Sequence, residues 1–182
     1  MTVDVNIFNQ MILEKGAKNS SVIEVSGIHF DPELRKACEQ NYCGNFGKNW
    51  TCPPLCGDVN ELIKRAKQYT HAVVFQTIHT LEDSYDFEGM TKASKEHNTI
   101  VKDVFKATKE MIGDNSLVLG AGGCSECEVC AKMDEEPCRH PDLAITSLEA
   151  YGMYVSKIAH LGGMKYINGQ NTVTYFGMVL FN

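Results

Sequence analysis

The cysteines are the residues whose types and spacing indicate chemistry most directly. Cys124, Cys127 and Cys130 follow one another with two residues in each gap, and Cys138 comes after a gap of seven residues, directly after a proline. This run is too closely spaced and too polar to form the buried face of a helix or a strand. Three closely spaced cysteines with a fourth, more distant cysteine beside a proline are typical of iron–sulfur ligation. We therefore expect a [4Fe-4S] cluster at these four residues, which we call the second quartet.

Four more cysteines lie earlier in the chain, in a segment without sustained periodicity. They are Cys38, Cys43, Cys52 and Cys56, here called the first quartet, and 67 residues separate them from the second quartet. Their gaps of four, eight and three residues fit an iron–sulfur cluster, and they also fit two cysteine pairs around a structural zinc ion. We expect one or two [4Fe-4S] clusters in the protein, with zinc as the alternative.

Several residues beside the cysteines are candidates for contact with a bound cofactor. Arg139 and His140 directly follow the last cysteine, where they could bind an anion, deliver a proton or hydrogen-bond cluster sulfurs. Trp50, with Tyr42 and Phe46 nearby in the sequence, could stack on a planar ligand or exclude water from a cluster. Arg139, His140 and Trp50 are thus predicted cofactor-binding residues.

The composition is that of a globular protein, with 43% hydrophobic and 22% charged residues. The net charge is −6 and no basic run stands out, which argues against a nucleic-acid or anionic-membrane partner. No stretch approaches the ~20 apolar residues of a membrane span. The first ten residues lack the basic flank and apolar run of a signal peptide, so we expect a cytoplasmic protein. Reducing compartments disfavour disulfides, which favours metal binding by the cysteines.

Hydrophobic periodicity predicts a single α/β domain over residues 1–182, with a small mixed sheet and flanking helices. The segment 71–80 contains a continuous apolar run, as expected of a strand buried on both faces. His97 falls on the buried stripe of its helix, which indicates a core histidine. The predicted strands are 21–30, 71–80, 116–120 and 172–181, and the predicted helices are 5–15, 32–40, 59–68, 90–112 and 148–161.

Two cysteine-rich metal-binding loops, 38–56 and 124–138, complete the predicted fold. The second loop follows directly on the strand 116–120 and so leaves that strand at its C-terminal end. Open α/β sheets usually place their ligands at this end of the strands. The sequence therefore predicts that a core strand positions the second quartet.

Longer motifs surround these cysteines. They are Cys43-Gly-Asn-Phe-Gly-Lys-Asn-Trp-Thr-Cys52-Pro-Pro, Gly122-Gly-Cys124-Ser-Glu-Cys127-Glu-Val-Cys130, Pro137-Cys138-Arg-His-Pro with the later Ser147-Leu-Glu-Ala, and the closing Thr172-Val-Thr-Tyr-Phe-Gly-Met. From about Glu33 onward the chain resembles a family of small, uncharacterised, predicted metal-binding proteins from anaerobic bacteria and archaea. The resemblance implies metal binding by these cysteines and implies no particular activity.

Three functions are compatible with these patterns. If cysteine holds every iron, the simplest function is electron transfer or redox sensing, with a redox partner protein or a small molecule as partner. If one iron lacks a protein ligand, the protein is an iron–sulfur enzyme that acts on a small molecule at the open iron. If the metal is zinc, the protein is a zinc-stabilised binding module, whose closing strand Tyr175–Phe181 could pair with a second copy in a homodimer.

Overall fold

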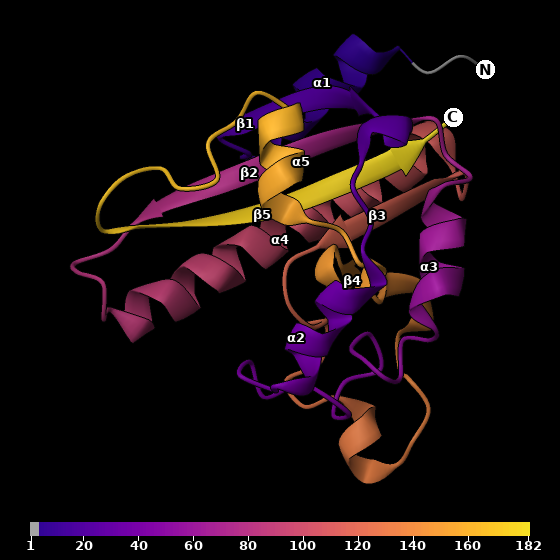
Figure 1. The fold of residues 1–182 in the computed structure, drawn as a ribbon, viewed down its shortest axis with the longest axis vertical. Helices are drawn as coiled ribbons and strands as arrows, with labels where there is room; N and C mark the ends of the chain where they lie inside the picture. The colour runs from indigo at the N-terminus through magenta and orange to yellow at the C-terminus, as the bar shows by residue number, and fades with distance from the viewer. Residues whose placement is uncertain (1–3) are drawn as a thin grey trace.

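The computed structural model describes residues 4–182, which build one five-stranded sheet with helices on both faces (Figure 1). The strands, in their order across the sheet, are β1 (Asn19–Glu24), β2 (His71–Thr80), β5 (Thr172–Phe181), β3 (Ser116–Gly120) and β4 (Thr146–Ser147). The α-helices are α1 (Val5–Glu14), α2 (Lys36–Glu39), α3 (Val59–Ala66), α4 (Phe87–Ile112) and α5 (Val155–Leu161). The predicted α/β fold class is confirmed.

The sheet is mixed, as predicted. β1, β2, β5 and β3 pair with their neighbours in antiparallel fashion, and β3 pairs with the short β4 in parallel. Side chains alternate between the two faces along each strand. In β2, Val73 and Phe75 belong to one hydrophobic cluster, while Ala72 and Val74 belong to the other. The prediction that this strand is buried on both faces is therefore confirmed.

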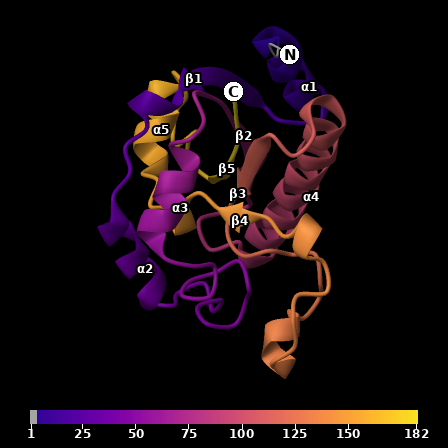
Figure 2. The same cartoon turned by 90° about the vertical axis from the view of Figure 1, so that its right-hand side faces the viewer.

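Helices cover both faces of the sheet (Figure 2). α1 and α4 pack on one face, where Phe8 and Val104 are completely buried. α3 and α5 lie over the other face, where Ala66 and Ile158 are buried against the strands. The cysteine loops lie beyond the β4 edge of the sheet, at the bottom of Figure 1.

Local sequence signals account for several helix boundaries. The Asp58 side chain accepts hydrogen bonds from the backbone N–H groups of Asn60 and Glu61, at 2.9 and 3.2 Å, and so caps α3. Asp31 caps the helical segment 32–39 in the same way, and its first turn, Pro32–Arg35, is a 3-10 helix. Gly113, with φ +65°, ends α4.

Two predicted elements are wrong in part. The strand predicted over 21–30 ends at Glu24, because the chain turns there into the 3-10 helix Val25–Gly27. The helix predicted over 148–161 forms only from Val155 onward. Gly152 interrupts it with φ +64°, and its carbonyl accepts a hydrogen bond from the Asp31 N–H at 2.7 Å. A tertiary contact thus overrides the helical periodicity.

The closing strand also differs from one expectation. The apolar half of β5, Met178–Phe181, is paired with β2 on one side and with β3 on the other. The edge suggested over Tyr175–Phe181 is therefore an interior strand from Met178 onward, and pairing with a second copy in a homodimer stays a prediction.

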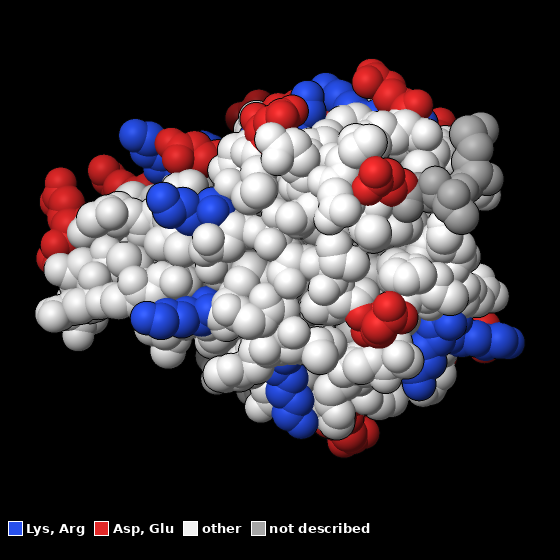
Figure 3. Space-filling model, turned by 90° about the horizontal axis from the view of Figure 1, so that it is seen from above, with Lys and Arg blue, Asp and Glu red and all other residues white. Residues whose placement is uncertain are grey.

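Charged side chains are scattered over the face of the molecule seen in Figure 3. Lysines and arginines lie among aspartates and glutamates, and neither sign forms a continuous patch there. Within residues 4–182, none of the helices combines the length and the apolar character that crossing a bilayer requires.

Gly177 allows β2 and β5 to pack closely. The register pairs it with Phe75, and a Cβ atom built on Gly177 would lie 2.3 Å from Cζ of the Phe75 ring. We expect Gly177→Ala to lower the free energy of unfolding by about 1–3 kcal/mol through overpacking. Urea unfolding measures this change. The same substitution should cost less in a Phe75→Leu background, and strictly additive costs would contradict the contact.

His97 is completely buried, and its Nδ1 lies 2.9 Å from the Thr77 hydroxyl. Burial lowers the pKa of His97 to about 4, and the nearby His79 adds to the effect. The unfolded chain, with a histidine pKa near 6.5, therefore binds a proton before the native state does. The contribution of His97 to the free energy of unfolding is fully present above about pH 6.5. It is lost as the pH falls toward 4, by about 3 kcal/mol in total.

Urea unfolding of the wild type and of His97→Leu between pH 7.5 and 4.5 tests this linkage. The wild type should lose more stability than the variant over this range, since the other titrating groups are common to both proteins. Equal slopes would show that His97 does not take part.

Candidate metal centres

The second quartet lines a single small cavity. Its four cysteines surround a space of about 20 Å³, together with Arg139 and His140 from the same loop. Asn49, Trp50 and Thr51 close the cavity from the first loop. The chain thus gathers four thiols that the sequence spreads over fifteen positions.

The cysteines of the first quartet influence one another. Burial, together with the charges of Cys43, Cys56 and Cys38, raises the pKa of Cys52 to about 12. Burial likewise raises the pKa of Cys38 and of Cys56, while the Arg35 guanidinium opposes this effect at both residues. Cys52 is buried, Cys38 and Cys56 are half-buried, and Cys43 is exposed.

The chemistry of these donors fits a soft metal centre. Thiolates are the ligands that zinc, copper(I) and iron–sulfur clusters take, and seven of the eight cysteines are buried or half-buried, Cys43 being the exposed one. Among residues 4–182, no three or more His, Cys, Asp or Glu side chains are grouped as ligands of a single metal ion.

Two polar side chains join the two loops. The Asn49 amide donates a hydrogen bond to the Cys124 carbonyl at 2.9 Å, and the Thr51 hydroxyl accepts one from the Cys124 N–H at 2.9 Å. The same hydroxyl donates to the Asn49 side-chain oxygen at 3.0 Å. Both side chains are buried, each with 6% of its surface exposed. Both backbone groups of Cys124 are therefore paired with the first loop.

Gly123 brings the two quartets into contact. A Cβ atom built on Gly123 would lie 3.1 Å from the Cys52 sulfur and 3.2 Å from the Asn49 amide nitrogen. A side chain at this position would push the loops apart, so a glycine lets the backbone of one quartet approach a cysteine of the other.

Ion pairs and hydrogen bonds from charged side chains stabilise the second loop. Lys102 of α4 forms an ion pair with Glu126 at 2.9 Å and donates to the Ser125 carbonyl at 3.2 Å. Arg139 donates to the Val129 carbonyl at 3.1 Å and contacts the Asp134 carboxylate at 3.3 Å. The guanidinium thus already has protein partners, which favours a bracing role over anion binding.

The three predicted cofactor-binding residues, Trp50, Arg139 and His140, all line the cavity of the second quartet. Trp50 reaches it from the first loop, donates a hydrogen bond to the Glu136 carbonyl at 3.0 Å, and has the Lys132 ammonium 5.4 Å from its ring centre. Tyr42 lines a different cavity, so Trp50 and Tyr42 do not form one stacking wall.

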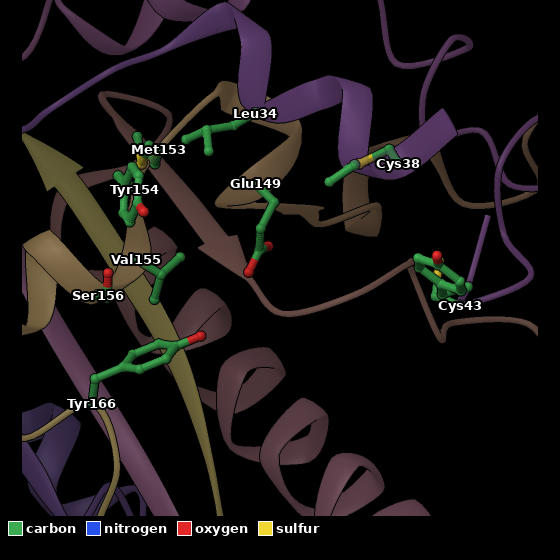
Figure 4. Close-up of a pocket in the computed structure, with 11 residues that line it drawn as sticks. Leu34, Cys38, Cys43, Glu149, Met153, Tyr154, Val155, Ser156 and Tyr166 are labelled. Carbon is green, nitrogen blue, oxygen red and sulfur yellow. The ribbon is translucent and has the colours of Figure 1, made fainter. Parts of the chain in front are cut away.

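That other cavity opens beside the first quartet (Figure 4). Its volume is about 420 Å³, and Cys38, Cys43 and Glu149 are among the residues that line it. The carboxyl group of Glu149 faces the cavity, and the residue as a whole is exposed to solvent. Partial desolvation by the surrounding protein raises the pKa of this carboxyl group, and hydrogen bonds from its own backbone and from Ser147 partly offset the shift.

Sequence reasoning missed Asn49, Thr51 and Glu149. The first two stand between the cysteines of the first loop, where short polar side chains commonly bond to backbone. Their position between the cysteines was the sequence signal that could have identified these two residues. Glu149 follows Thr146 by three residues, a capping-box pattern that predicts the start of a helix and gives no sign of a pocket residue.

Thr51→Val should loosen the junction between the loops, since valine keeps the shape of the side chain but leaves the Cys124 N–H unpaired. The loss of this buried hydrogen bond, worth about 1–3 kcal/mol, should make the Cys124 amide exchange with solvent about 10–100-fold faster. Hydrogen exchange followed by NMR or mass spectrometry measures this rate. Thr51→Ser is the matched control, and it should exchange like the wild type. Equal protection in the valine variant would refute the role of Thr51.

Comparison with known proteins gives one result. Neither the search of curated proteins nor that of solved structures found a match. The model of the predicted metal-binding protein family DUF2284 matches residues 21–181, which include all eight cysteines of both quartets. The chain therefore belongs to this family of predicted metal-binding proteins.

Proposed function

We propose that each cysteine quartet holds a [4Fe-4S] cluster and that the protein acts in electron transfer or redox sensing. The observation that carries this proposal is the junction of the two quartets, where a Cβ atom on Gly123 would lie 3.1 Å from the Cys52 sulfur. Two four-thiol sites that share a boundary favour passage of electrons between them. Zinc sites that only stabilise a fold have no need of such proximity.

Each quartet provides one cysteine for each iron of a cube. A cluster ligated in this way supplies uptake and release of single electrons without an open coordination position. The thiols must lose their protons when they bind metal. Arg35 assists at Cys38 and Cys56, because its positive charge favours the thiolate forms.

Three side chains surround the second quartet, of which Trp50 is half-buried and Arg139 and His140 are exposed. Trp50 and Arg139 line the cavity and are held in place by backbone carbonyls of residues 136 and 129. His140 completes the lining. We assign these three residues to positioning of the second cluster.

The first quartet contains the exposed cysteine, Cys43, whose neighbour Tyr42 has 92% of its surface exposed. We propose that electrons enter or leave at Cys43, through a redox partner protein or a small molecule.

Anaerobic purification followed by iron, sulfide and zinc analysis tests the proposal. We expect about eight irons and eight sulfides per chain, with a broad visible absorption band that bleaches on reduction. Cys127→Ser and Cys52→Ser should each remove up to about four irons, because each substitution affects one quartet. Ser125→Ala is the matched control in the second loop, and it should keep the full iron content.

Other metal contents point to the remaining functions. About two zinc ions and no visible band would overturn the redox proposal and leave a zinc-stabilised binding module. About four irons would restrict the cluster to one quartet. If both cysteine variants kept the full metal content, the ligand assignment would be wrong.

A further inference from the structure

The cavity beside the first quartet has the dimensions of a ligand site. Its volume of about 420 Å³ lies within the range of pockets that hold small molecules. It is built by three segments that are far apart in the sequence, namely 34–43, 149–156 and residue 166. Figure 4 shows the Glu149 carboxyl group reaching into the middle of this space, with the Tyr166 hydroxyl directed toward the same space. Cys38 and Cys43 bound its other side.

Among the residues that line the pocket, the side-chain charge has one sign, while the Lys157 ammonium lies over Tyr154 at its margin. Glu149 is the single ionisable carboxylate among the eleven lining residues, and none of them is Lys, Arg or His. A ligand with a positive charge is therefore favoured over a neutral or an anionic one.

Aromatic rings surround the same space. Tyr42, Tyr154 and Tyr166 line the pocket and expose 92%, 38% and 46% of their surfaces. One face of Tyr154 has the Lys157 ammonium 4.8 Å from its ring centre, and Tyr166 stacks on Phe176 at 5.8 Å. Exposed aromatic rings beside a carboxylate are the groups that recognise ammonium ions through cation–π attraction.

The remaining walls are mostly apolar. Leu34, Ala37, Met153 and Val155 contribute hydrocarbon surface, and Ser156 adds a hydroxyl group. Such walls suit the alkyl or aromatic body of a ligand and not a heavily hydrated inorganic ion.

We propose that this pocket binds a small organic ammonium ion, with its positive charge between Glu149 and the tyrosines and its apolar body against Leu34, Met153 and Val155. The bound molecule would lie next to Cys38 and Cys43. The binding of the ammonium ion does not depend on the proposed function. That the neighbouring cysteines form a redox centre rests on the proposed function. Binding there would make the first quartet the place where a small molecule meets the metal site.

Choline and its neutral isostere 3,3-dimethylbutan-1-ol test the proposal as matched probes, because they share a shape and differ in charge. Isothermal titration of the anaerobically purified, metal-containing protein should show choline binding about tenfold more tightly than the isostere. Glu149→Gln should remove most of this preference, and Tyr166→Leu should weaken choline binding severalfold. Glu110→Gln, an exposed carboxylate of α4 outside the pocket, is the control and should bind choline like the wild type.

Three results would overturn the proposal: no heat of choline binding up to about 20 mM, which corresponds to a negligible affinity; equal affinity for the two probes; or an unchanged preference in Glu149→Gln. Circular dichroism of each variant confirms that it is folded. Metal analysis of the same samples separates the two proposals. Zinc in place of iron with selective choline binding would refute the redox function alone, and iron without choline binding would refute the pocket alone.

Discussion

The arrangement of the two cysteine loops depends on two side chains that form hydrogen bonds with the backbone of Cys124. Asn49 and Thr51, from the first cysteine loop, pair with the carbonyl and the N–H of Cys124 in the second loop. Neither loop has regular secondary structure around these residues, so few ladder hydrogen bonds order it. Because polar groups buried at the junction must be paired, the two loops have a single favourable way to meet. The geometry of both quartets follows from this contact.

The sheet determines where the loops can meet. The second loop follows directly on β3, a core strand, and α4 holds it through Lys102. The first loop follows α2, and a 3-10 turn capped by Asp31 precedes α2. The N–H of Asp31 also donates a hydrogen bond to the Gly152 carbonyl. The break at Gly152 also places Glu149 at the pocket. One tertiary contact, between Asp31 and Gly152, thus helps to shape both the first quartet and the cavity beside it.

The sequence predicts those features whose signals lie within a short segment of the chain. A continuous apolar run indicates β2 correctly, and cap residues such as Asp58 indicate where helices begin. The grouping of the cysteines indicates two loops. The junction of these loops was not predictable, because Thr51 and Cys124 are 73 positions apart and such a contact leaves no periodic pattern. The pocket was missed for the same reason, since Tyr42, Glu149 and Tyr166 meet only in the folded chain.

Trp50 is the only tryptophan in the chain, and it connects the two loops by its hydrogen bond to Glu136. Its indole ring also lines the cavity of the second quartet. The fluorescence of the whole protein at long ultraviolet excitation therefore originates at one known position. The molecule carries a built-in optical reporter, whose emission responds both to the closeness of the two loops and to whatever occupies the cavity beside it.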